Sequence, residues 1–312
     1  NERELISFVT ENFDKVIVLI ATVSPMELGE LQANEKVDSI MYIGLPGTYG
    51  AYGIGNVVTG KANPSGGLYD IYASNSMSSP AMRNMGHFEL TNAGDIVRKD
   101  TSSVGTRGTD PGFQHYLIEA EGIYVGYRYY DRKEMAVQFP FGHGLSYTTF
   151  KYSNLKIDNG QLSFTVKNTG SVAGAEIAQI YLGKAESARL RPRKELFSFT
   201  KLFLRAGEQC RVTADLSLVS FYNAETDAWV RETGEYTVYV GSSVKDIRLT
   251  KTFPMEGEAY TPCEAKSSDY LQTHSNILSD GYVADVKKPR RPRKHWVLKT
   301  VGVLLSVLAV AL

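Results

Sequence analysis

The N-terminal part of the chain shows the hydrophobic pattern of an α/β structure. Residues 2–13 place apolar side chains near helical spacing, which predicts a helix with one apolar face. Residues 15–22 and 37–44 are short apolar runs of the kind found in strands buried on both faces. Residues 25–31 begin with a proline, which favours a short helix, and residues 47–60 predict a glycine-rich helix. Two buried strands that alternate with helices predict a parallel sheet with covering helices.

Residues 62–120 lack a clear period. They include the word Asn63-Pro-Ser-Gly and, over residues 99–112, a stretch rich in Gly, Ser, Thr and Asp. Long irregular segments inside compact domains are often lids or walls of functional sites, so we expect a long site loop here.

The pattern changes near Phe150 and becomes a period of two. From there to Phe253, short apolar-polar alternations recur, for example over residues 162–166 and 210–216. Strands at this spacing over about 100 residues predict an antiparallel β-sandwich of the immunoglobulin or fibronectin type III kind, with one solvated face per sheet.

The C-terminal part is polar, then basic, then apolar. Residues 255–295 predict a linker, in which residues 287–294 hold six Lys or Arg. We expect residues 296–312 to be the start of a transmembrane helix, which needs about 20 apolar residues in full. The alternative is an amphipathic or aggregation-prone tail. Trp296 and the basic run Lys287 to Lys294 suit the lipid headgroup region, and they favour membrane association at the cytoplasmic face.

The charge is balanced over the whole chain but uneven along it. The 312 residues hold 34 Lys or Arg and 34 Asp or Glu. Residues 287–312 hold seven Lys or Arg and no Asp or Glu, so the remainder carries a net negative charge. This distribution excludes a uniformly basic nucleic-acid-binding protein. The chain does not begin with Met and ends inside an apolar run, so we expect a piece of a longer protein.

A glycine series from Gly44 to Gly60, followed by Lys61, coincides with a predicted helix after a strand, where a nucleotide site would lie. Two features argue against such a site. Ala62 offers no hydroxyl group for Mg²⁺, and Gly60-Lys61 falls at the end of the helix, where the dipole disfavours phosphate. Close packing of a small-residue helix on the sheet is the alternative.

Other candidate reactive residues lack partners nearby in the sequence. Ser242 and Lys245 have Ser-x-x-Lys spacing, but they lie between two strand patterns and predict a hairpin turn. Cys210 lies on the apolar side of its strand and predicts a small buried hydrophobe, whereas Cys263 lies in the linker. The five histidines show no metal-ligand spacing: His87, His115, His143, His274 and His295. We therefore expect neither a metal site nor a cofactor.

Glu121 ends the irregular segment and precedes a tyrosine-rich run over residues 124–130, which predicts a strand. A carboxyl group among these rings would be partly desolvated, and desolvation favours the protonated form that a general acid needs. Aromatic rings also stack on sugar faces. A glutamate ahead of a strand is otherwise usually a solvated surface residue.

Two long sequence segments, at and shortly after Glu121, resemble the junction between the second and third domains of glycoside hydrolase family 3. The first is EGIYVGYRYYD, residues 121–131, and the second is FPFGHGLSYTTF, residues 139–150. Shorter words resemble the end of the family's α/β sandwich domain and its fibronectin type III-like domain. These are residues 37–47, 60–66, 167–170, 232–243 and 246–249.

The resemblance covers roughly residues 1–254 and implies two domains. Residues 1–149 resemble the C-terminal part of the α/β sandwich domain, and residues 150–254 resemble the fibronectin type III-like β-sandwich. The family contains β-glucosidases, β-xylosidases and related exo-acting enzymes, so a retaining glycosidase is implied. In such enzymes two carboxyl groups about 5–5.5 Å apart flank the scissile bond. The resemblance assigns the acid/base role to Glu121, with Glu119 as the local alternative.

The chain departs from the family pattern in two places. The family's nucleophile is an aspartate in a Ser/Thr-Asp-Trp-like word on a separate (β/α)8 barrel, and this chain has no barrel. Residues 226–229, Thr-Asp-Ala-Trp, are not that word and lie in the fibronectin-like region. Residue 67 is Gly, where the family's Asn-Pro-Ser-Gly word is usually followed by Arg.

The sequence therefore predicts a piece of a membrane-associated, retaining, exo-acting β-glucosidase-like enzyme. Its substrate would be a β-glycoside or an oligosaccharide. The chain would supply the acid/base carboxyl group while the nucleophile lies on the missing barrel, so the piece alone would be inactive. The alternatives are a non-catalytic carbohydrate-binding or scaffolding β-sandwich protein at the membrane, and nucleotide binding by the segment from Gly44 to Lys61.

Overall fold

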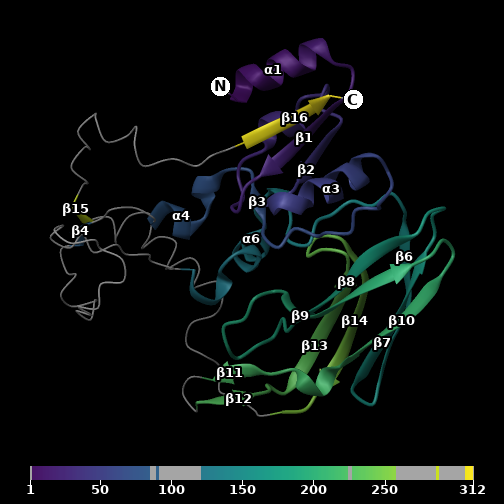
Figure 1. Cartoon of the computed structure of the whole chain (residues 1–312). Coiled ribbons are helices and arrows are strands. Elements are labelled where there is room, and N and C mark those ends of the chain that lie inside the picture. The colour runs from purple at the N-terminus through teal and green to yellow at the C-terminus, as the bar shows by residue number, and fades with distance from the viewer. Residues whose placement is uncertain are drawn as a thin grey trace. The chain divides into compact units, whose positions relative to one another are not determined.

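The structure is a computed structural model that describes residues 2–84, 89–90, 121–223, 227–257, 286–287 and 306–311 (Figure 1). The chain divides into two compact units. The first contains residues 1–74, 126–266 and 305–312, and the second contains residues 75–125 and 267–304. The described elements are a mixture of α and β with mostly sheet.

The N-terminal part of the first unit is an α/β layer. Helix α1 (Glu2–Asn12) precedes strand β1 (Val16–Ala21), which pairs in parallel with β2 (Ser39–Tyr42). The short helix α2 (Gly29–Gln32) lies between the two strands in sequence, and α3 (Gly47–Val58) follows them. The predicted parallel strand pair and the glycine-rich helix are confirmed. The short helix predicted over residues 25–31 forms as α2, and it begins four residues after Pro25.

The core of this layer forms on β1. The alternate valines Val16 and Val18 are fully buried and pack with Val9 of α1, Leu28 and Tyr72. Asp38 holds the start of the strand, because its carboxylate accepts hydrogen bonds from the Val16 amide at 2.8 Å and from Lys15 at 3.0 Å. These contacts make β1 the centre of the layer.

The C-terminal apolar run forms a strand where we expected a helix. Strand β16 (Ser306–Ala311) pairs antiparallel with β1, with Ala311 opposite Val16. A short run rich in valine suits a strand, and the free edge of β1 offers unpaired backbone groups for it. In the part of the chain that the structure describes, no helix is long and apolar enough to cross a membrane. The rest of the expected anchor, 296–305, and the basic residues 288–294 lie outside the described residues.

The second half of the first unit is a sandwich of two antiparallel sheets, drawn in teal and green in Figure 1. One sheet has the order β10-β7-β6 and the other has the order β14-β13-β8-β9. Their bounds are β6 (Phe150–Asp158), β7 (Gln161–Asn168), β8 (Gly174–Gly183), β9 (Glu195–Leu204), β10 (Gln209–Asp215), β13 (Gly234–Gly241) and β14 (Ile247–Met255). The predicted antiparallel sandwich is confirmed.

The sandwich core contains the alternating residues that the sequence indicated. Leu162, Phe164 and Val166 of β7 are almost fully buried and face Ile180 and Val238 of the other sheet within one cluster. Cys210 of β10 is half-buried and packs against the edge of this cluster, which fits the expected role as a small hydrophobe. Cys263 lies outside the described residues.

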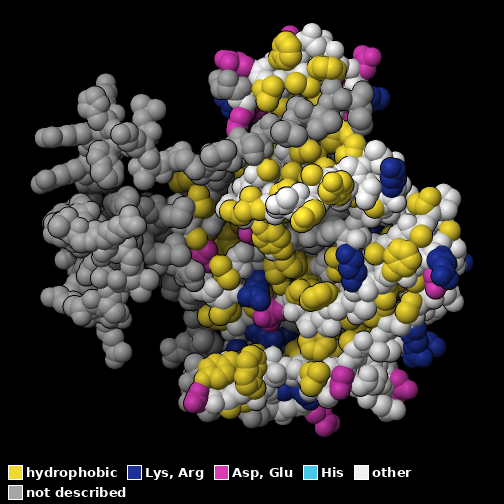
Figure 2. Space-filling model, in the orientation of Figure 1, with side chains coloured by type: hydrophobic (Ala, Val, Ile, Leu, Met, Phe, Trp, Pro, Cys, Tyr) yellow, Lys and Arg dark blue, Asp and Glu magenta, His cyan; other side chains and the backbone are white. Residues whose placement is uncertain are grey.

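A small hairpin extends from the sandwich. The 3₁₀ helix η3 (Leu216–Leu218) leads into β11 (Phe221–Asn223), which pairs antiparallel with β12 (Ala228–Val230). Tyr222 and Trp229 lie opposite each other on the exposed face, and Figure 2 shows hydrophobic side chains gathered over this hairpin.

The α/β layer and the sandwich meet where two of the segments that resemble the family, residues 60–66 and 139–150, contact each other. The Asn63 side chain accepts hydrogen bonds from the Ser146 hydroxyl at 3.0 Å and the Tyr147 amide at 2.8 Å. It also donates to the Ala173 carbonyl at 3.0 Å, directly before β8. A Cβ atom at Gly67 would lie 2.9 Å from the Gly142 carbonyl oxygen, so the backbones approach closely here.

The segment after residue 62 contains more regular structure than we expected. Strand β3 (Tyr72–Ala73) pairs with β5 (Val137–Phe139), and η1 (Ser76–Ser78) and α4 (Pro80–Asn84) follow β3. Asn75 caps η1 by accepting a hydrogen bond from the Met77 amide, which explains why a helical turn starts there. In the second unit, β4 (Glu89–Leu90) pairs with β15 (Val286–Lys287). Residues 91–120 lie outside the described residues.

Phe164→Ala should lower the free energy of unfolding by about 3–5 kcal/mol, because Phe164 is 1% exposed and its removal leaves a cavity between the sheets. The matched control is Phe199→Ala on β9, where the ring is 63% exposed and the expected change is within about 0.5 kcal/mol. Urea unfolding of both variants, followed by circular dichroism, measures the difference. Equal losses would contradict this assignment of the core.

Candidate active site

Glu121, the predicted acid/base, is a buried residue. It is 3% exposed and lies directly before the 3₁₀ helix η2 (Gly122–Tyr124). Its carbonyl oxygen accepts a hydrogen bond from the Tyr124 amide at 3.0 Å, and Tyr124 is fully buried. The solvated surface glutamate that we considered as the alternative is therefore excluded.

The tyrosine-rich run after Glu121 is helical, so the strand we expected there is wrong. After η2, Gly126 opens the helix α6 (Tyr127–Arg132). Gly122 and Gly126 have φ of 52° and 68°, in the region where residues with a side chain are strained. These two turns break the alternation that predicted a strand. Glu119, the local alternative to Glu121, lies outside the described residues.

Helix α6 carries an aspartate that we did not single out from the sequence. Asp131 is 5% exposed, and its Oδ1 lies 3.1 Å from Lys194 Nζ and 3.6 Å from Lys245 Nζ. Lys194 Nζ also donates to the Val244 carbonyl at 2.9 Å. An aspartate after an aromatic run was the available sequence signal, but its two partners are distant in the chain and only the fold brings them together.

Tyr127 makes a second contact between α6 and the sandwich. Its hydroxyl oxygen accepts a hydrogen bond from the Leu196 amide at 2.8 Å. The ring stacks on Phe141 with centroids 4.8 Å apart and meets Tyr181 edge-on at 6.1 Å. Burial raises the pKa of the Tyr127 phenol, so this group stays neutral and serves as an acceptor for β9.

A cavity of about 500 Å³ lies in the α/β layer, beside β2. Its walls are mostly apolar and include Ile40, Tyr42, Leu68, Tyr72 and His143. Burial lowers the pKa of His143, whose ring lies 5.1 Å from that of Phe139. A neutral histidine against an aromatic ring gives this cavity little catalytic chemistry.

The structure describes His143 alone among the three histidines that could have met in space, since His87 and His115 lie outside the described residues. Within the described residues, no group of three or more His, Cys, Asp or Glu side chains could hold a metal ion. Gly60 and Lys61 follow the C-terminal end of α3, where the helix dipole does not favour phosphate. The geometry therefore adds nothing to the nucleotide alternative.

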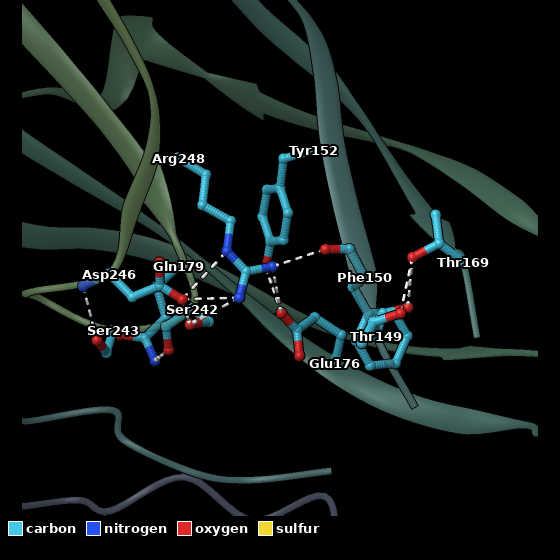
Figure 3. Close-up of polar contacts among 10 residues, drawn as sticks. All are labelled: Thr149, Phe150, Tyr152, Thr169, Glu176, Gln179, Ser242, Ser243, Asp246 and Arg248. Carbon is cyan, nitrogen blue, oxygen red and sulfur yellow. Dashed lines mark hydrogen bonds and ion pairs between the residues drawn. The ribbon is translucent and has the colours of Figure 1, made fainter. Parts of the chain in front are cut away.

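A polar cluster joins the two sheets of the sandwich, as Figure 3 shows. The Arg248 guanidinium stacks on the Tyr152 ring, 4.8 Å from its centroid. Arg248 donates to Asp246 Oδ2 at 2.7 Å and lies 3.5 Å from Glu176 Oε1. The Tyr152 hydroxyl donates to Glu176 at 2.9 Å. Strands β6, β8 and β14 each contribute one side chain, so the cluster fastens one sheet to the other.

The titration of this cluster follows from its burial and its ion pairs. Burial raises the pKa of Glu176 and of Tyr152, and hydrogen bonds from Arg248 lower the pKa of Asp246. The adjoining cavity of about 30 Å³ has room for a water molecule only. The cluster therefore stabilises the sandwich and has no space for a sugar.

Ser242 and Lys245 lie in the turn between β13 and β14, as expected. The Ser242 amide donates to the Asp246 carbonyl at 3.2 Å, which closes the turn. Asp227 of the Thr-Asp-Ala-Trp word lies in the β11–β12 hairpin with φ of 51°, and its carboxylate accepts a hydrogen bond from Tyr222. Ser242 and Asp227 therefore make contacts within turns, which agrees with the hairpin turn that the sequence predicted for Ser242 and Lys245.

Two family models match the chain over the parts that form these structures. Residues 1–147 match the glycosyl hydrolase family 3 C-terminal domain, and residues 176–244 match the fibronectin type III-like domain. The chain belongs to glycosyl hydrolase family 3 through this C-terminal domain. The resemblance that the words around Glu121 and Phe141 suggested is thereby confirmed.

Known members of the family are similar to the chain over most of its length. Thermostable β-glucosidase B of Acetivibrio thermocellus is 33% identical over 262 residues, which cover 81% of this chain and 31% of that protein. Probable β-glucosidase L of Aspergillus fumigatus is 33% identical over 278 residues, which cover 81% of this chain and 34% of that protein. The crystal structure of the family 3 β-glucosidase of Bifidobacterium adolescentis aligns with a TM-score of 0.68 at 29% identity, over 88% of this chain and 39% of that one. The chain therefore spans about a third of the length of the curated relatives it matches.

Asp246→Asn should lower the free energy of unfolding at pH 7 by about 0.5–1 kcal/mol, because it removes a partly exposed ion pair with Arg248. The folded-state pKa of Asp246 is lowered, so this stabilisation is present above the ordinary aspartate pKa and is lost as the pH falls through the folded-state value. The difference between wild type and variant should therefore vanish toward about pH 2. Urea unfolding between pH 7 and about pH 2 measures this difference, and Asp158→Asn at an exposed aspartate is the control. A difference that stays constant across this pH range would contradict the contribution of the Asp246–Arg248 ion pair.

Proposed function

We propose that this chain is part of a retaining β-glucosidase-type glycoside hydrolase and supplies the acid/base carboxyl group from Glu121. The burial of Glu121 in a tight turn carries the proposal. A buried carboxyl group favours its protonated form, which is the form that donates a proton to a leaving oxygen. Membership in the family and similarity to β-glucosidases support this class of reaction.

The reaction would run in two steps that share one acid/base. In the first step, a nucleophilic carboxylate attacks the anomeric carbon while Glu121 gives its proton to the glycosidic oxygen, and the alcohol leaves. In the second step, the Glu121 carboxylate takes a proton from water, whose oxygen attacks the same carbon and releases the sugar. The nucleophile would lie on a (β/α)8 barrel outside this chain, and the domain boundary within the chain would fall near residue 150.

The 312-residue chain on its own should not hydrolyse glycosides, because it would hold only half of the carboxyl pair. The measurement is the release of 2,4-dinitrophenol from an aryl β-glucoside by the purified chain, beside the full-length protein that contains it. Turnover by the isolated chain that survives repurification would contradict the proposal.

In the full-length protein, Glu121→Gln should reduce kcat/KM roughly 10²–10⁴-fold for glycosides with a poor leaving group, such as alkyl glucosides. Substrates with a good leaving group, such as 2,4-dinitrophenyl glucoside, need little protonation, so their first step should change much less. Azide should restore turnover of 2,4-dinitrophenyl glucoside, because azide attacks the glycosyl-enzyme in the second step without a general base.

The matched control is Glu134→Gln, which neutralises an exposed glutamate thirteen residues further on and should leave both substrates unaffected. Equal losses on both classes of substrate, with no response to azide, would remove Glu121 from the acid/base role. Steady-state kinetics on paired substrates decide the outcome.

A further inference from the structure

The β11–β12 hairpin carries two aromatic side chains on its outer face. Tyr222 and Trp229 lie directly opposite each other in the strand register, and their rings meet edge-on with centroids 5.8 Å apart. Tyr222 is 48% exposed and Trp229 is 71% exposed. Single exposed apolar residues are ordinary on a protein surface, whereas a contiguous group of large ones marks a candidate binding site. Figure 2 shows such a group over this hairpin.

The inner face of the hairpin fixes these two rings in place. The alternate residues Asn223 and Val230 are 6% and 8% exposed, so they point toward the sandwich while Tyr222 and Trp229 point away from it. The Arg191 guanidinium lies 5.0 Å from the centroid of the Phe221 ring on the same inner side. A two-stranded hairpin alone is marginal in water, so these inner contacts hold it. Rings that are held before binding cost little entropy when a ligand arrives.

A carboxylate lies at the edge of the aromatic pair. Asp227 is exposed, and its φ of 51° lies in the left-handed region, which a short polar side chain tolerates. The Tyr222 hydroxyl donates a hydrogen bond to the Asp227 carboxylate. A carboxylate has about four acceptor positions, so Asp227 can accept further hydrogen bonds from a ligand. We call Tyr222, Asp227 and Trp229 the hairpin patch, which combines apolar ring faces with a charged acceptor.

This combination matches the chemistry of a pyranose ring. A β-glucopyranosyl unit carries its substituents equatorially, so its two faces present axial C–H groups and its rim presents hydroxyl groups. The negative face of an aromatic ring attracts the weakly positive hydrogens of C–H groups. A rim hydroxyl can donate to the Asp227 carboxylate, and hydrogen bonds to a charged acceptor are stronger than neutral ones. An apolar protein segment would instead desolvate this carboxylate and offer it no donor.

We propose that the hairpin patch is a sugar-binding site on the fibronectin-like sandwich, which takes a β-glucosyl unit of an oligosaccharide or a glucan chain. The choice of a β-glucosyl unit rests on the proposed function. The patch holds the sugar and does not cleave it. A sugar contact of this kind raises the effective concentration of a long substrate chain near the enzyme to which it is tethered.

The first test follows the fluorescence of Trp229. The 312-residue chain has two tryptophans, so Trp229 is the only one in the Trp296→Phe variant. Cellotetraose should change the Trp229 emission in a saturable way, with a midpoint of roughly 1–10 mM, as expected for a stacking contact on an exposed surface. Sorbitol, which has hydroxyl groups but no ring, should have no effect at equal concentrations. Emission that stays unchanged up to about 50 mM cellotetraose would overturn the inference.

The second test compares variants of the chain by electrophoresis through gels that contain hydroxyethylcellulose, a soluble β-glucan derivative. The wild type should migrate more slowly than in a plain gel. Trp229→Ala should bind about tenfold more weakly and lose this retardation, whereas Trp229→Phe, which keeps a ring, should retain part of it. The matched control is Phe203→Ala, which removes a ring that is 69% exposed on β9 of the same sandwich and should leave the retardation unchanged. Equal retardation of the wild type and Trp229→Ala would contradict the site.

The carboxylate is tested by Asp227→Asn, because asparagine also tolerates the left-handed backbone of this turn. The variant replaces a charged acceptor by a neutral one, so the midpoint of the cellotetraose titration should rise roughly threefold. A midpoint equal to that of the wild type would remove the reason for preferring a sugar and would overturn the inference.

Parallel measurements separate this site from the proposed function. The Glu121→Gln chain should bind cellotetraose as the wild type does, because binding at the hairpin needs no turnover. If cellotetraose leaves the Trp229 emission unchanged while Glu121→Gln shows its leaving-group dependence in the full-length protein, the sugar site is wrong and the acid/base assignment stands. If cellotetraose binds and Glu121→Gln shows no such dependence, the acid/base assignment is wrong and the sugar site stands.

A second copy of the chain is the competing occupant of the hairpin patch, and sedimentation velocity detects it. If the chain forms a dimer that Trp229→Ala dissociates and that cellotetraose leaves intact, the patch is a contact between copies and the sugar site is wrong. A monomer whose Trp229 emission responds to cellotetraose supports the site.

Discussion

The hydrogen bonds of one amide side chain, Asn63, set how the α/β layer meets the sandwich. This side chain accepts from Ser146 and Tyr147 and donates to Ala173, so it binds three segments that are far apart in sequence. The backbones around Gly67 and Gly142 approach too closely for a side chain at residue 67. The junction therefore combines small residues with an amide that both accepts and donates hydrogen bonds, and the cavity beside β2 and the start of β8 lie next to it.

The sandwich supports the α6 segment as well as itself. Its own stability comes from the core around Phe164 and Ile180 and from the Arg248 cluster between the sheets. One end of its larger sheet then holds α6, a helix too short to persist alone.

The titratable groups divide into two kinds by their surroundings. Glu176, Asp246 and Arg248 satisfy one another beside a cavity that admits only water, so their altered pKa values report packing. Glu121 directly precedes Gly122, which has a positive φ, and the backbone of this turn holds the carboxyl group in a buried place. Perturbed titration alone would have singled out the Arg248 cluster, although it has no space for a sugar.

The sequence by itself determined the classes of structure and the family. Period-two alternation over β7 and β10 predicted the sandwich, the two apolar runs predicted the parallel pair of β1 and β2, and the words around Glu121 identified the family. Only the tertiary structure decided that the run after Glu121 is helical, because Gly126 and the partners of α6 override its strand-like alternation. It likewise paired residues 306–311 with β1 as a strand, since a free sheet edge is not visible in a local pattern. Asp131 contacts Lys194 and Lys245, which follow it by 63 and 114 positions in the sequence. Only the folded chain brings side chains so far apart in sequence together.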